Sequence, residues 1–280
     1  MKRYALLLLA VLLPCFTLSA QDYSAEDSII YERYVAQMNA INPKGNQDLL
    51  ICTALFFEGT PYVASTLEKI PERLVVNLRE LDCTTFAENV IALARTYRQK
   101  NHSFKAFCKN LELLRYRNGK VDGYTSRLHY ISDWIFTNDR KGIVKDECEA
   151  IGQTPLTVKL NFMTRHPESY APLKNNPQAI ETMKKIEAEN NARDHYYLPK
   201  SDIDKKGDLI HNGDMICFAT SIDGLDATHV AIAYHRNGKL TFVHASASYK
   251  KVVVCKGTLS QFVEHNKSMI GLFVARPLFN

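Results

Sequence analysis

One hairpin signal near the C-terminus constrains the fold of this chain more than any other feature. Two apolar, β-type runs, "THVAIAYH" and "KLTFVHAS", are separated only by a short polar stretch that contains Asn237-Gly238. Asn-Gly between such runs is the strongest short-range signal for a two-residue hairpin loop. We therefore predict two antiparallel strands in which Arg236 faces Lys239.

This register places two histidines on one side of the predicted hairpin. Ala231 comes to lie opposite His244, and His229 opposite Ser246. Opposed residues share a side, and the side alternates along each strand. His229 and His244 are then diagonal neighbours on one face. A three-residue loop would put them on opposite faces, so the pairing depends on the turn type.

The remaining pattern places helices first and a sheet last. Helical spacing covers 25–42, 46–58 and the stretch that begins at Cys83, and 177–194 reads as a surface helix. The second half holds β-type runs within 207–222, 228–235, 239–246 and 250–256, a short helix within 257–266 and a last strand at 269–278. This order predicts an α+β fold with a mostly antiparallel sheet.

The first twenty residues have the layout of a secretory signal peptide. A basic start is followed by an apolar run, 4–13, that is too short to span a membrane. A lipoprotein signal lipidated at Cys15 is the alternative, and Pro14 makes it the poorer fit. We expect residues 1–20 to be removed, and 21–280 to form a single domain that is exported, most simply to the periplasm, without stable membrane insertion.

Composition excludes several classes of partner and cofactor. The net charge of +5 is mild and gives no sign of a nucleic-acid surface. With 46% hydrophobic residues, the chain can build a core without disulfides. The mature part keeps an even number of cysteines, so disulfides stay open, although several of these cysteines lie in core-like runs. No zinc-binding spacing occurs, and we expect no metal.

Cys83 stands at the predicted start of a helix. Asp82 is a good N-cap, and Cys83 shares an apolar face with Phe86 and Val90. The helix N-terminus stabilises an anion and predicts a lowered thiol pKa. A cysteine, a base histidine and a third orienting group form the general thiol-nucleophile arrangement. From spacing alone, a buried structural cysteine remains an equal alternative.

A second group of candidates falls in the long middle section. Arg127, His129, Tyr130 and Trp134 crowd into eight residues. Arginine suits a carboxylate, and aromatic rings suit the faces of sugars. The alternative is that Tyr130 and Trp134 form the core face of one helix. Asp226 either binds a polar substrate group or holds the turn before the histidine strand.

At these residues the chain resembles a known group of enzymes. The segments "GTPYVAS", "LDCTTFAENV", "THVAIAY" and "FVHASAS" are similar to motifs of NlpC-type cysteine peptidases in the papain-like superfamily. The segments "GYTSRLHYISDWI", "LNFMTRHPESY", "YLPK" and "GLDATHVAIA" resemble the bacterial N-acetylmuramoyl-L-alanine amidase-like branch. The resemblance runs over most of the mature chain. Thr84 replaces the more usual serine, and Ala231 the usual glycine.

The resemblance implies a papain-like, NlpC-type core in which the nucleophile helix packs on the sheet, with a large insertion at about 100–200. It implies Cys83 as nucleophile, His229 as base and His244 as the orienting residue. Tyr62 and Asp82 are expected beside the substrate. No organic cofactor is implied.

The activity implied by the resemblance is hydrolysis of the N-acetylmuramoyl-L-alanine bond in peptidoglycan fragments, with soluble anhydro-muropeptides as the substrate. One alternative is another enzyme on this scaffold, either an endopeptidase that cuts between γ-D-glutamate and diaminopimelate or an acyltransferase. The other is an exported, non-catalytic binding module. Sequence leaves the oligomeric state open.

Overall fold

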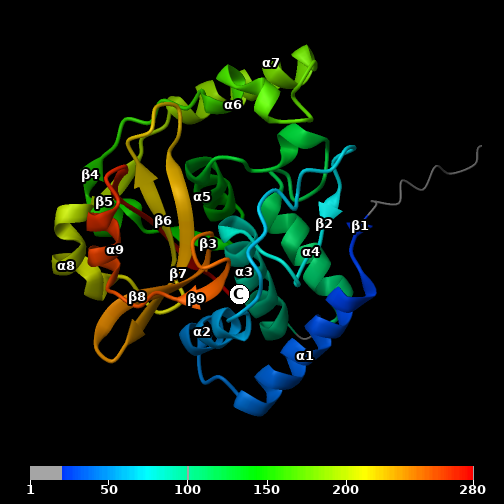
Figure 1. Ribbon diagram of the computed structural model, residues 1–280, viewed down its shortest axis with the longest axis vertical. Coiled ribbons are helices and arrows are strands. Elements are labelled where there is room, and N and C mark those ends of the chain that lie inside the picture. Colours follow the sequence, from blue (N-terminus) through cyan, green and yellow to red (C-terminus); the bar gives the residue numbers. More distant parts are fainter. Residues whose placement is uncertain (1–20, 100, 280) are drawn as a thin grey trace, which may run out of the picture.

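The computed structural model describes residues 21–99 and 101–279 (Figure 1). The predicted signal peptide and Cys15 lie outside the described residues. Within the described part the chain folds as a mixed α+β protein around an antiparallel sheet.

The sheet has eight strands, and every pairing within it is antiparallel. Along the sheet lie β4 (Thr154–Pro155), β5 (Tyr196–Pro199), β10 (Met269–Pro277), β6 (Met215–Thr220), β7 (Ala227–Arg236), β8 (Lys239–Ser246) and β9 (Lys251–Val254), and β3 (Val144–Asp146) also pairs with β10. The last strand of the chain therefore lies inside the sheet. A separate parallel pair joins β1 (Gln21–Asp22) to β2 (Leu74–Val75).

The predicted hairpin register is confirmed. Arg236 pairs with Lys239, and the ladder continues to the pair Ile232–Val243. Asn237 and Gly238 have φ values of 52° and 73°. Positive φ at both central residues is what a type I′ turn requires, and its twist matches that of the strands.

Four helices from the first half of the chain cover one face of the sheet. They are α1 (Ala25–Ile41), α2 (Asn46–Phe56), α3 (Cys83–Arg98) and α4 (Phe104–Arg115). Helix α3 is the central one: Phe86 and Val90 are fully buried and join the same apolar cluster as Val230 of β7. This packing fixes the position of the α3 N-terminus against the histidine strand.

The opposite face packs against α8 (Ile203–Lys206) and α9 (Leu259–His265). Because side chains alternate along a strand, β7 sends Ala231 to this face while Val230 goes to the α3 face. Figure 1 shows α8 and α9 on the other side of the sheet from α1, α2 and α4.

The long middle section forms a third cluster beside the sheet. It is built by α6 (Phe162–Arg165), α7 (Pro177–Asn191) and the turn at Tyr124–Ser126. Helix α5 (Ile131–Arg140) instead buries Trp134 and Ile135 in the same cluster as α3. Further short helical turns lie at Cys148–Gly152, Pro167–Ser169, Lys200–Asp202 and Gly207–Leu209. Helix α7 confirms the predicted surface helix, and α6 and α7 lie together at one end of the molecule (Figure 1). The short strands β3, β4 and β5 gave no sequence signal.

The described cysteines all carry free thiols: Cys52, Cys83, Cys108, Cys148, Cys217 and Cys255. The disulfide alternative therefore does not hold in this structure. Among the described helices, none is long and apolar enough to cross a membrane.

Candidate active site

Cys83 is the first residue of α3, as the sequence predicted. The Asp82 carboxylate accepts a hydrogen bond from the Thr85 backbone N–H at 2.8 Å, and the Thr85 hydroxyl accepts one from the Asp82 N–H at 2.9 Å. This reciprocal cap satisfies orphan donors of the first helical turn. Asp82 was expected at the substrate, and the structure instead places its carboxylate in the cap.

The Cys83 sulfur lies between α3 and β7. It accepts hydrogen bonds from the backbone of Val230 and from both the backbone and the side chain of Thr84. Burial, followed by the nearby Asp82 carboxylate, raises the pKa of the Cys83 thiol to about 11. The prediction of a lowered pKa is thus wrong, because desolvation of the buried thiolate outweighs its three donors.

The two histidines predicted to share a face are in contact. His229 Nε2 and His244 Nδ1 are 2.7 Å apart, a hydrogen bond between the two rings. The pair is packed among aromatic rings, with Phe218 stacked on His229 at 5.4 Å and Phe242 edge-on to His244 at 4.9 Å. Burial lowers the pKa of His229 to about 3, with help from His244, and that of His244 to about 4.

Cys83 and His229 line one cavity of about 180 Å³. Its wall also includes residues from α5, α6 and the loops beside them, and the complete lining is Cys83, Thr84, His129, Tyr130, Ile131, Met163, Tyr170, Leu225, Asp226, Ala227, Thr228, His229 and Val230. His244 holds Nε2 of His229, so Nδ1 is the ring nitrogen left for Cys83. No lysine or arginine is among these described lining residues.

Tyr62 lies beside the nucleophile without lining this cavity. Its backbone N–H donates to the Lys250 carbonyl at 2.9 Å, and Tyr62 bridges to Leu81. Burial, then the Cys83 and Asp82 charges, raise the pKa of the Tyr62 hydroxyl. The structure therefore places Tyr62 near Cys83, as the resemblance implied.

Asp226 holds the turn before β7. One carboxylate oxygen accepts from the Ser132 N–H and hydroxyl, both at 2.7 Å, and the other accepts from the Ala227 N–H at 2.8 Å. The sequence left open whether Asp226 binds a substrate group or holds the turn before the histidine strand, and these bonds favour the turn. The carboxylate also ties the start of α5 to the histidine strand.

Arg127 and Trp134 do not line the cavity, and carboxylates of the protein interior engage both side chains. Arg127 is 5% exposed and pairs with Glu68 at 2.8 Å and Glu72 at 3.3 Å. Trp134 is fully buried, and its indole N–H donates to Glu88 at 3.1 Å. Apolar spacing cannot distinguish a ring that stacks on a sugar from one that fills a core, and here the core reading holds.

His129 and Tyr130 both line the cavity, but they differ in how far their polar atoms are already hydrogen-bonded within the protein. The Tyr130 hydroxyl donates to Glu187 at 2.7 Å and accepts from the Met163 N–H at 3.0 Å, so only its ring is presented. His129 Nε2 contacts the Tyr124 carbonyl at 2.9 Å. Burial, then Arg127, lowers the pKa of His129 to about 3.

Several lining residues were not predicted as site candidates from the sequence, among them the polar Thr84, Tyr170 and Thr228 and the apolar Met163. Met163 and Tyr170 belong to the segment "LNFMTRHPESY", which carried the family resemblance. That resemblance was the only signal that pointed to them, because nothing in local spacing connects α6 with a cysteine some eighty residues earlier.

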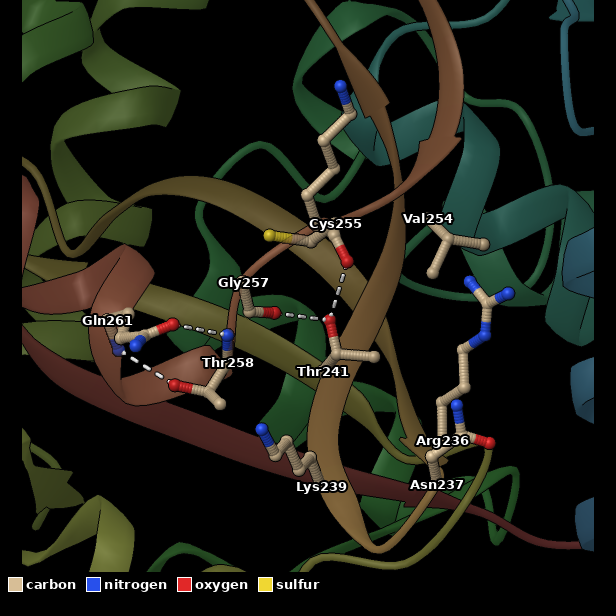
Figure 2. A pocket seen from close by; sticks show the side chains of 10 residues that line it. Arg236, Asn237, Lys239, Thr241, Val254, Cys255, Gly257, Thr258 and Gln261 are labelled. Atoms are coloured by element: carbon tan, nitrogen blue, oxygen red, sulfur yellow. Dashed lines mark hydrogen bonds between the residues drawn. The ribbon is translucent and has the colours of Figure 1, made fainter.

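A larger hollow, of about 450 Å³, lies at the other end of β7 (Figure 2). Its lining includes Arg236, Lys239, Lys256 and Cys255. Figure 2 shows the Thr241 hydroxyl donating to the carbonyls of Cys255 and Gly257, at 3.0 and 2.8 Å. None of its described lining residues is a histidine or carboxylate, so it offers no base for Cys255.

The described residues contain no group of three His, Cys, Asp or Glu side chains arranged to hold a metal ion. The chemistry available at the cavity is that of a thiol with a hydrogen-bonded imidazole pair.

Comparison with known proteins points to one family. The model of the AmiA-like, N-acetylmuramoyl-L-alanine amidase-like family matches residues 53–271. An N-acetylmuramoyl-L-alanine amidase from Bacteroides uniformis is 40% identical, with a TM-score of 0.80 over 83% of this chain and 98% of that one. No curated protein matches the chain.

Two further solved structures are similar. A putative xylanase from Bacteroides fragilis is 42% identical, with a TM-score of 0.76 over 80% of this chain and 98% of that one. A Legionella pneumophila protein is 21% identical, with a TM-score of 0.68 over 90% and 94% of the two chains, and shows the shared fold. On the family match and the 40% identity to the Bacteroides uniformis enzyme, this chain belongs to the N-acetylmuramoyl-L-alanine amidase-like family.

Proposed function

We propose that this chain is an exported, periplasmic cysteine amidase that hydrolyses the N-acetylmuramoyl-L-alanine bond of soluble peptidoglycan fragments, anhydro-muropeptides above all. We also propose that its core is of the papain-like, NlpC type. The observation that carries the activity is the single cavity in which Cys83 meets the His229–His244 pair. Family membership and the Bacteroides uniformis amidase support the choice of bond.

The first step forms a thioester. The Cys83 sulfur attacks the lactoyl carbonyl of the muramoyl group, and its proton passes to His229 Nδ1. His229 then carries protons on both nitrogens, and its Nε2–H donates to His244 Nδ1 across the 2.7 Å contact. The C–N bond breaks as the L-alanine nitrogen takes the proton from His229.

The second step releases the sugar. His229 removes a proton from water, whose oxygen attacks the thioester carbonyl, and the thiolate leaves and is reprotonated. The backbone N–H of Cys83, which has no partner among the described residues, supplies an oxyanion donor. Thiol and imidazole both start neutral, so the thiol proton moves to His229 as the sulfur attacks.

The charge of the cavity favours this bond over the endopeptidase alternative. A γ-D-glutamyl-diaminopimelate bond carries carboxylates on both sides, and these need cations for binding. The described lining has no lysine or arginine, and its histidines are neutral. A muramoyl-L-alanine bond is flanked by an uncharged sugar and a methyl group, which suit such a wall.

A xylanase and a non-catalytic binding module fit the cavity less well. A xylanase needs a pair of carboxylates beside the glycosidic bond, whereas the one carboxylate in the described lining, Asp226, is bonded to Ser132 and Ala227. A binding module has no need for a hydrogen-bonded histidine pair next to a thiol. An acyltransferase shares the first step and differs only in the acceptor.

The test is a digest of a defined disaccharide-tetrapeptide, read by mass spectrometry. We expect free tetrapeptide beginning with L-alanine and the intact disaccharide. A disaccharide-dipeptide with a diaminopimelate-containing dipeptide would establish the endopeptidase instead. Intact sacculi run in parallel test the fragment preference, and their rapid solubilisation would contradict it.

A further inference from the structure

His129 offers the cavity a fixed hydrogen-bond acceptor. A carbonyl only accepts, so the 2.9 Å contact with the Tyr124 oxygen requires the proton on Nε2. Nδ1 then carries a lone pair. None of the described residues donates to it, and the ring lines the cavity that holds Cys83. His129 is tilted against the Tyr124 ring at 4.4 Å, which holds its orientation.

Tyr170 offers the complementary group on the same cavity wall. Its side chain is half-buried, and its hydroxyl has no hydrogen-bond partner among the described residues. By contrast, the neighbouring Tyr130 hydroxyl is fully engaged by Glu187 and Met163. Tyr170 therefore has a free O–H donor, and His129 a free acceptor, in a cavity of about 180 Å³ that fits one small uncharged group.

A secondary amide can bind both groups: its N–H can donate to His129 Nδ1, and its carbonyl can accept from the Tyr170 hydroxyl. In a muramoyl substrate the lactoyl ether is attached to the sugar carbon next to the one that bears the acetamido group. With the lactoyl carbonyl at Cys83, the acetamido group is the nearest amide on the sugar side of the scissile bond. It is uncharged and small, as this cavity requires.

We propose that His129 Nδ1 accepts the acetamido N–H of the muramoyl sugar, and that the Tyr170 hydroxyl donates to the acetamido carbonyl. This assignment rests on the proposed amidase function. It makes His129 and Tyr170 specificity-determining residues that select an N-acetylated sugar at the acyl side of the bond.

The experiment compares two muramoyl-L-alanyl peptides that differ by one group. In the second, an acetoxy ester replaces the acetamido group, which removes the N–H and keeps the carbonyl. Wild-type protein should cleave the acetoxy analogue about tenfold less efficiently in kcat/KM, the effect of one neutral hydrogen bond. His129→Leu should lose about tenfold on the natural substrate and cleave both substrates alike.

His129→Gln is the matched control, because its amide keeps a donor for Tyr124 and an acceptor for the substrate. It should restore most of the activity and the preference for the acetamido substrate. Tyr170→Phe should lower kcat/KM on both substrates by a similar factor, since both keep the carbonyl. Thermal unfolding and labelling of Cys83 by iodoacetamide report whether each variant keeps a folded site.

The outcomes separate the two proposals. If neither peptide releases an L-alanine product, the proposed function fails. If both are cleaved at equal rates by wild-type protein, the amidase stands and the assignment of His129 is overturned. If His129→Leu still prefers the acetamido substrate over the acetoxy analogue, another group accepts the acetamido N–H, and the assignment of His129 is likewise overturned.

Discussion

Two half-buried cysteines at opposite ends of β7 have opposite surroundings. Cys83 lies in a cavity without lysine or arginine among its described lining residues, next to His229. Cys255 lies at a hollow with Arg236, Lys239 and Lys256, toward the hairpin end of β7. Burial raises the pKa of both thiols. Nearby positive charge therefore does not mark the functional cysteine here.

What distinguishes Cys83 is a set of oriented groups. Val230 and Thr84 direct donors at its sulfur, and a histidine shares its cavity. At the Cys255 hollow the Thr241 hydroxyl is engaged by the carbonyls of Cys255 and Gly257, and no histidine or carboxylate is among the described lining residues. A thiol with a high resting pKa needs a partner that accepts its proton during the attack, and only the first site provides one.

The largest expected effect separates the two cysteines. Cys83→Ser should abolish release of L-alanyl peptide, a loss of about 10,000-fold or more, because a hydroxyl is a far weaker nucleophile at this position. Cys255→Ser should leave turnover unchanged. Product release measured by mass spectrometry checks both, and comparable losses in the two variants would remove the distinction between the sites.

Removal of the base should have nearly the same effect. His229→Ala should lower kcat about 1,000-fold or more, since His229 is the lining imidazole that the His244 ring holds for proton transfer. His235→Ala is the control on the same strand, because the His235 ring contacts the Ile210 carbonyl and does not line the cavity of Cys83. Full activity in His229→Ala would eliminate it as the base.

His244 should matter less than His229. His244→Ala should lower kcat about 10- to 100-fold, because an orienting residue contributes less than the base that it holds. His244→Gln keeps an oxygen that can accept the His229 Nε2–H and should retain more activity. A loss as large as that of His229→Ala would make His244 a direct participant in proton transfer.

The pH dependence of alkylation tests the state of the thiol. Since the pKa of Cys83 is raised to about 11, its labelling by iodoacetamide should increase about tenfold per pH unit from neutral pH upwards. Mass spectrometry of the labelled peptide gives the rate at each pH. A plateau between pH 5 and 7 would show a preformed thiolate–imidazolium pair and contradict the neutral resting state.

A further prediction concerns the stability of the fold rather than catalysis. His129, His229 and His244 stay neutral in the folded protein, with pKa values of about 3, 3 and 4, while the unfolded chain protonates them below about pH 6.5. Stability should therefore fall as pH drops from 6.5 towards 4, by about 1.4 kcal/mol per pH unit for each proton. Urea unfolding at pH 7, 6 and 5 measures the slope.

His244→Phe supplies the control for this slope. The His244 ring is surrounded by Phe242 and Phe262, so phenylalanine suits the site. In this variant the slope of the unfolding free energy against pH should be smaller by the contribution of one proton. An unchanged slope would mean that His244 does not contribute to acid destabilisation.

Local sequence determined the parts of the site that depend on neighbours in the chain. Asp82 before an apolar helix fixed the start of α3 at Cys83, and Asn237-Gly238 fixed the register that joins His229 to His244. Both signals work through backbone geometry over a few residues, one by capping free N–H groups and the other by requiring positive φ. The α+β order of elements followed in the same way.

Only the tertiary structure decided the roles of the residues between the cysteine and the base. Arg127 and Trp134 have the chemistry of substrate contacts, yet Glu68, Glu72 and Glu88 engage them in the interior. The direction of the Cys83 pKa shift was decided likewise, because burial is a sum over distant segments that no local pattern contains. Sequence specified which groups the chain carries and how its turns are made, and packing decided which of those groups remain free to meet a substrate.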